Sequence, residues 1–194
     1  MMNKPLLLIV FSSLLLLQGC AGMVAAGAAT GGAAAVDRRT LGTQLGDQAI
    51  EMRALHRLGE TKPLWDQSKL SVISTNGKAL LLGQTPTEAY RSQAEEVVGG
   101  VPGVEEVFNE IRLGQPVSLA VRSQDTWITS KVKSTLLAEK NIDGTKIKVV
   151  TENAEVFLLG LVTQREADIA VQLSRNISGV AKVVTVFEYV QAAP

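Results

Sequence analysis

The sequence of 194 residues has one cysteine, one histidine and few aromatic side chains, 4% in all. A single cysteine excludes a disulfide within the chain, and no group of histidine, cysteine and carboxylate residues has the spacing of a metal site. The lone His56 is interpreted as a solvated side chain on a helix surface. We therefore expect no catalytic residues, no metal and no cofactor, and the chain is predicted not to be an enzyme.

The chain also lacks an excess of charge of either sign. Nineteen basic residues balance nineteen acidic ones, so the formal net charge is zero. Binding to nucleic acid depends on an excess of basic residues, and we expect no nucleic-acid partner. Two adjacent acidic pairs, Glu95–Glu96 and Glu105–Glu106, are interpreted as solvated charges, because neighbours in a helix point about 100° apart and neighbours in a strand lie on opposite faces.

An apolar run at the N-terminus, residues 6–17, follows Lys4 and ends just before Cys20. It is shorter than the roughly 20 residues that a membrane-spanning helix needs, but it suits a secretory signal. The sequence Leu-Gln-Gly-Cys at residues 17–20 resembles a bacterial lipobox, which implies a signal peptide at residues 1–19 and lipid, palmitate included, on Cys20. The alternative is an ordinary signal peptide with a chance cysteine. Because Ala21 follows the cysteine, the resemblance implies the outer membrane.

Residues 20–44 are predicted to be a tether between this anchor and the folded part. Residues 21–36 are all small or apolar and carry no charge, and such a glycine- and alanine-rich stretch cannot build a packed core. As a flexible coil the tether would reach roughly 25–30 Å. The alternative is a short helix lying on the membrane.

The remaining chain contains an internal repeat. Residues 72–83 match residues 149–160 at an offset of 77, which pairs Asn76 with Asn153 and Gly83 with Gly160. Each segment predicts a strand, a tight turn at the asparagine and a second strand. The two glycines are interpreted as turn positions that need little side-chain bulk. Helices are predicted before and after each hairpin, followed by a last strand; the ranges are 47–59, 87–98 and 107–113 in the first copy and 125–139, 163–177 and 183–190 in the second.

These patterns predict an α+β fold of two tandem modules, at residues 45–114 and 122–191. Each has the order αββαβ, with two helices packed on a small mixed three-stranded sheet. A module of about 70 residues without disulfides is marginally stable by itself, so we expect contact between the two copies to add stability.

Both copies resemble the BON domain, a small module of bacterial periplasmic proteins. The stretches that carry the resemblance are residues 109–112, 125–129, 151–153 and 155–163. A lipobox followed by two BON domains is similar to the DolP/YraP family of outer-membrane lipoproteins. That resemblance implies binding of anionic phospholipid through the first helix of the second module. It also implies a place on the periplasmic side of the outer membrane, with enrichment at the division septum, and a role in envelope integrity.

The residues of that helix indicate the same surface. At 100° per residue, an apolar stripe of Ile128, Val132, Thr135 and Leu136 is expected to face the core. The opposite side carries Trp127, Ser130, Ser134 and Leu137, with Lys131 and Lys133 at its edges. The predicted phospholipid-binding residues are Thr126, Trp127, Ser130, Lys131, Lys133, Ser134 and Leu137.

An apolar outward face flanked by lysines suits a surface of anionic lipid headgroups, such as phosphatidylglycerol or cardiolipin. The first module suits it less, because Ala49 replaces Trp127 and its net charge is −3, against +1 for the second. Two alternatives remain open. Trp127 and Leu137 could pack against the first module, or they could bind an envelope protein in an adaptor for envelope assembly or cell-wall remodelling.

Overall fold

The computed structural model describes residues 41–191. The expected signal peptide, Cys20 and the tether up to residue 40 lie outside the described residues. Within 41–191, no helix has both the length and the apolar character needed to cross a membrane. The first described helix, α2, begins at Leu41, so the prediction of a tether up to residue 44 is wrong for its last four residues.

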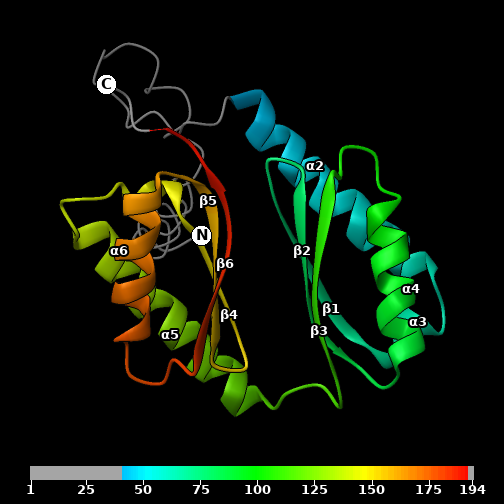
Figure 1. Ribbon diagram of the computed structural model, residues 1–194. Helices are drawn as coiled ribbons and strands as arrows, with labels where there is room; N and C mark the ends of the chain where they lie inside the picture. The colour runs from blue at the N-terminus through cyan, green and yellow to red at the C-terminus, as the bar shows by residue number, and fades with distance from the viewer. Residues whose placement is uncertain (1–40, 192–194) are drawn as a thin grey trace, which may run out of the picture. The chain divides into compact units, whose positions relative to one another are not determined.

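Each module has the predicted order αββαβ, with one additional short helix between its first helix and its first strand (Figure 1). The first module comprises α2 (Leu41–Glu60), α3 (Leu64–Gln67), β1 (Lys69–Thr75), β2 (Lys78–Thr85), α4 (Glu88–Gly99) and β3 (Glu106–Leu113). The second comprises α5 (Leu119–Ala138), the 3₁₀ helix η2 (Gly144–Lys146), β4 (Lys148–Glu152), β5 (Glu155–Val162), α6 (Gln164–Arg175) and β6 (Lys182–Tyr189).

Both sheets are mixed, as predicted. In the first, β2 pairs antiparallel with β1 and parallel with β3; in the second, β5 pairs in the same way with β4 and β6. The strand β1 is thus one edge of its sheet, and β4 is the equivalent edge of the other. The two longer helices of each module cover one face of its sheet, as Figure 1 shows.

The central strands are buried on both faces, which explains their continuous apolar runs. Along β2, Leu81 packs into the core beneath α2 and α4, whereas Leu80 and Leu82 point to the other face. Along β5, Leu158 and Phe157 divide in the same way. The faces that lack helices share one buried cluster, made of Leu80, Leu82, Phe157, Leu159 and Val186. The expected contact between the copies is therefore an apolar one between their sheets.

The interpretation of Gly83 and Gly160 as turn residues is wrong. Both lie inside a central strand, at φ of +127° and +151°. A Cβ built on Gly83 would lie 1.8 Å from the backbone oxygen of Lys69, and one on Gly160 would lie 2.3 Å from that of Lys146. The backbone of the preceding edge segment therefore passes too close for any side chain at these positions.

Candidate functional site

The helix α5 carries the predicted site and begins earlier than the sequence patterns indicated. Its N-cap is Ser118, whose side chain accepts a hydrogen bond from the backbone N–H of Val121. The predicted start at residue 125 and the expected module boundary at residue 122 both fall inside the helix. A serine N-cap shortly after Pro116 is a helix-start signal that could have located the true beginning.

The inward side of α5 is as predicted. The side chains of Ile128, Val132 and Leu136 are buried in the core of the second module, and Thr135 is half-buried. Asp125 is also buried, and its role is structural, because both its oxygens accept hydrogen bonds from the β4–β5 turn.

The outward side of α5 is exposed. Trp127 is 49% exposed and Leu137 is 59% exposed, and the other predicted site residues are exposed with them: Thr126, Ser130, Lys131, Lys133 and Ser134. The prediction that the tryptophan and the leucine point into solvent is confirmed. The alternative in which they pack against the first module is wrong, because that contact is made by the sheets instead.

The hydroxyl groups on this face are turned back into the helix. Thr126 donates to the carbonyl of Arg122, Ser130 to that of Thr126 and Ser134 to that of Lys131, each at 2.9 Å. Their protons are therefore used within α5, and the hydroxyl oxygens can only accept. Hydrogen-bond donors for an anionic ligand must therefore come from the indole N–H of Trp127 and from the basic side chains at the edges of the face.

Those basic side chains lie on both edges. The ammonium of Lys131 lies 5.7 Å from the centre of the Trp127 ring, a cation–π contact that keeps a positive charge beside the most amphipathic side chain of the face. On the other edge lie Lys133 and, about three helical turns earlier, Arg122, both exposed. The sequence reasoning missed Arg122 because it placed the helix start too late.

The earlier start also adds Leu119, which is 74% exposed and lies on the same outward side of the helix as Leu137. From Leu119 to Leu137 the apolar face is about 27 Å long. At the C-terminal end of α5, the pKa of Glu139 is lowered by hydrogen bonds from the backbone and side-chain amides of Asn141. A carboxylate at this end repels anions, so the strongest attraction for an anionic surface lies nearer Trp127.

The first module also exposes apolar side chains on its first helix, which the sequence reasoning did not identify. On α2, Leu45 and Met52 are each 67% exposed. The basic residues of α2 are used differently from those of α5, because Arg53 and Arg57 donate to the backbone carbonyls of Pro102 and Gly100. The α2 face thus lacks the lysine-flanked character of α5.

Within residues 41–191 there is no group of three or more histidine, cysteine or carboxylate side chains that could hold a metal ion. The chemistry of α5 is that of a surface contact, with an apolar centre and a basic rim.

Comparison with known proteins identifies both modules. The BON domain model matches residues 46–115 and again residues 124–191. Among curated proteins, the chain is 42% identical over 156 residues to the 21 kDa hemolysin of Actinobacillus pleuropneumoniae, covering 80% of each chain. It is 38% identical over 183 residues to the outer membrane lipoprotein DolP of Haemophilus influenzae, covering 94% of this chain and 95% of that protein. It is 30% identical over 115 residues to the osmotically-inducible protein Y of Escherichia coli, covering 57% of each.

Proposed function

Because the chain belongs to the DolP/YraP family of outer-membrane lipoproteins with two BON domains, we propose that it binds anionic phospholipid through the outward face of α5 and so helps to maintain the outer membrane. In this proposal lipid on Cys20 anchors the protein at the periplasmic side of that membrane. The ligand is phosphatidylglycerol or cardiolipin, the role is non-enzymatic, and binding enriches the protein where anionic lipid collects, at the division septum.

The observation that supports the proposal is the exposure of Trp127 and Leu137 between basic side chains. A tryptophan ring favours the headgroup level, because its apolar body leaves water while its N–H stays hydrated. Each basic residue close to an anionic surface adds about 1 kcal/mol, screened by salt. Contact of this kind is weak by itself.

Weak contact suffices for an anchored protein. A short flexible linker gives an effective concentration of order mM, so a millimolar affinity for headgroups would already occupy the α5 face. The face then orients the protein on the membrane and adds no strength to the anchor.

The test uses the mature chain with Cys20→Ser, which has no lipid, and its binding to vesicles of phosphatidylglycerol or phosphatidylcholine. Trp127→Glu is expected to reduce partitioning into phosphatidylglycerol vesicles roughly tenfold or more, since it puts a repelled charge in place of an interfacial anchor. The matched control is Leu45→Glu, at an exposed apolar position on α2, and it should bind as the parent does. Unchanged binding by a folded Trp127→Glu protein would exclude α5 as the lipid contact.

A second candidate function is that of an adaptor for envelope assembly or cell-wall remodelling proteins. The observation in its favour is an open sheet edge in the second module, at β4. Crosslinking in cells from position 127 separates the two functions at the α5 face itself: lipid contact predicts adducts with phospholipid, and an adaptor using this face predicts one dominant protein adduct.

A further inference from the structure

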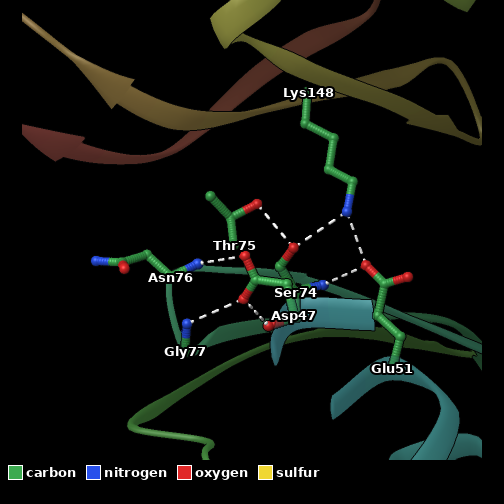
Figure 2. A network of polar contacts seen from close by, with 7 residues as sticks. All are labelled: Asp47, Glu51, Ser74, Thr75, Asn76, Gly77 and Lys148. Carbon is green, nitrogen blue, oxygen red and sulfur yellow. Dashed lines mark hydrogen bonds and ion pairs between the residues drawn. The ribbon is translucent and has the colours of Figure 1, made fainter. Parts of the chain in front are cut away.

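On the edge strand β1 of the first module, two side chains form hydrogen bonds with the outward-facing backbone groups of one residue, Ser74, and so close the strand edge there. The backbone N–H of Ser74 donates to Oε1 of Glu51 at 2.8 Å, and its carbonyl accepts from Nζ of Lys148 at 3.1 Å (Figure 2). Lys148 and Glu51 are themselves paired at 2.7 Å. Glu51 belongs to α2, whereas Lys148 comes from β4 of the second module.

These two side chains imitate a neighbouring strand. Ser74 lies opposite Ala79, one position from the tight turn at Asn76 and Gly77, so its N–H and carbonyl point away from β2. A residue on an added strand would accept from that N–H and donate to that carbonyl. The carboxylate of Glu51 and the ammonium of Lys148 do both, and β1 cannot accept another strand here.

The second module contains the same edge without this closure. By the repeat offsets, Thr151 corresponds to Ser74, Thr129 to Glu51 and Ser71 to Lys148. Thr151 lies opposite Val156, one position from the turn, so its N–H and carbonyl also point outward. The hydroxyl of Thr129 bonds to the hydroxyl of Thr151 at 2.8 Å and leaves the backbone untouched. Among residues 41–191, no side chain accepts the N–H of Thr151.

A groove of about 500 Å³ lies at this edge, between α5 and β4. Val149 and Thr151, whose backbone groups face outward, are 3% and 7% exposed and line it. Backbone groups shielded to this degree gain more from a hydrogen-bond partner than fully solvated ones. The groove therefore offers a row of backbone donors and acceptors beside apolar walls.

The charges around the groove favour an acidic partner. Arg122 and Lys133 line it, and neither forms an ion pair within the described residues. The acidic side chains nearby are engaged: Asp125 accepts two backbone hydrogen bonds from the hairpin, and Glu152 accepts one from Gln84.

We propose that the outer edge of β4 binds an extended segment of a protein partner, which pairs with Val149 and Thr151 as an added strand and carries an acidic side chain toward Arg122 and Lys133. The strand supplies the acceptor and the donor that Glu51 and Lys148 supply to Ser74. The internal repeat thus has one closed edge and one receptive edge. The groove shares Arg122 and Lys133 with the basic edge of the α5 face. The backbone groups that would pair with the added strand belong to Val149 and Thr151 of β4 and not to α5, so variants at the strand edge and at Trp127 can separate the two kinds of binding.

The test uses two double variants, one that adds the glutamate–lysine pair to the second module and one that removes it from the first. The double substitution Ser71→Lys with Thr129→Glu installs the missing pair beside Thr151, and Glu51→Thr with Lys148→Ser removes it beside Ser74. The probe is the blocked peptide acetyl-Val-Thr-Val-Glu-Val-Thr-amide, titrated into the millimolar range against the unlipidated Cys20→Ser chain, with backbone amides followed by NMR.

In the parent, the amides of Val149 and Thr151 are expected to shift with the peptide and that of Ser74 to stay. The Ser71→Lys, Thr129→Glu protein should lose these shifts, and the Glu51→Thr, Lys148→Ser protein should gain one at Ser74. The single variant Thr129→Glu provides a second closed edge, because its carboxylate would accept the N–H of Thr151, and it changes one residue where the double variant changes two. A parent without shifts at Thr151, or closed variants that keep them, would overturn the proposal.

Phosphatidylglycerol vesicles form the second arm. The closed variants should bind vesicles as the parent does, and Trp127→Glu should lose vesicles while keeping the peptide shifts. If closing the edge instead abolished vesicle binding and left peptide binding intact, the groove would belong to the lipid site and the proposal would be wrong.

Discussion

Oδ2 of Asp125 accepts a hydrogen bond from the backbone N–H of Asn153 at 2.9 Å, and Asp47 makes the same bond to Asn76 at the same distance. In each module a buried carboxylate on the first helix thus holds the hairpin turn of the edge strand. A second bond, to Ala154 or Gly77, completes each arrangement. The turns have positive φ at both central residues, which fits the twist of a two-residue hairpin, and the carboxylate satisfies their amides.

Substituting Asp125 by alanine should destabilise the protein by at least about 2 kcal/mol, because two shielded backbone N–H groups lose their acceptors. Asp125→Asn keeps one acceptor oxygen and should cost less. Urea denaturation followed by circular dichroism measures both. The control is Asp168→Asn, at an exposed position on α6, and a loss as large there would argue against a special role for the buried carboxylate.

Replacing Gly160 or Gly83 by alanine should destabilise the fold by more than about 2 kcal/mol, because the new Cβ meets a backbone oxygen at an unfavourable φ. Gly59 provides a matched control, since it lies in α2 with open space where a Cβ would stand. Gly59→Ala should stabilise by about 0.5–1 kcal/mol. Denaturant midpoints would reveal the opposite signs, and an unaffected Gly160→Ala protein would contradict the close approach of the strands.

Neutralising both lysines of the α5 face, with Lys131→Gln and Lys133→Gln, should weaken binding to phosphatidylglycerol vesicles by about 2 kcal/mol, or roughly 30-fold, at low salt. The difference from the parent should shrink as salt is added, because the charges are screened. Binding to phosphatidylcholine vesicles should change little. Equal losses on both lipids would mean that the lysines act through the fold and not through charge.

Phe157→Ala should cost about 3–5 kcal/mol, since the side chain is 2% exposed in the cluster between the two sheets. The loss should affect both modules, because Leu80 and Leu82 of the first pack in the same cluster. Hydrogen exchange of amides in β2 is the decisive measurement. Protection there that stays as in the parent would show that the modules do not stabilise each other.

Much of this protein follows from local pattern in the chain. The order αββαβ and the asparagine turns depend on neighbours within a few residues, and so does the buried stripe of Ile128, Val132 and Leu136. Periodicity in the sequence predicts these features directly. The repeat is visible by aligning the chain with itself. The direction of Trp127, away from the core of its own module, follows from the same helical geometry.

The tertiary structure decided what depends on segments far apart. The continuous apolar runs of β2 and β5 fit strands that are buried on both faces, but only the fold shows that Leu80 and Phe157 share a cluster. The sequence predicts a turn at Gly160, and only the structure shows that the backbone of Lys146 approaches this strand residue closely. The pairing of Glu51 with Lys148, nearly a hundred residues apart, closes one strand edge and leaves its repeat open. Each of these depends on which surfaces meet, and pairing between distant segments is set by packing of the whole chain and not by any local pattern.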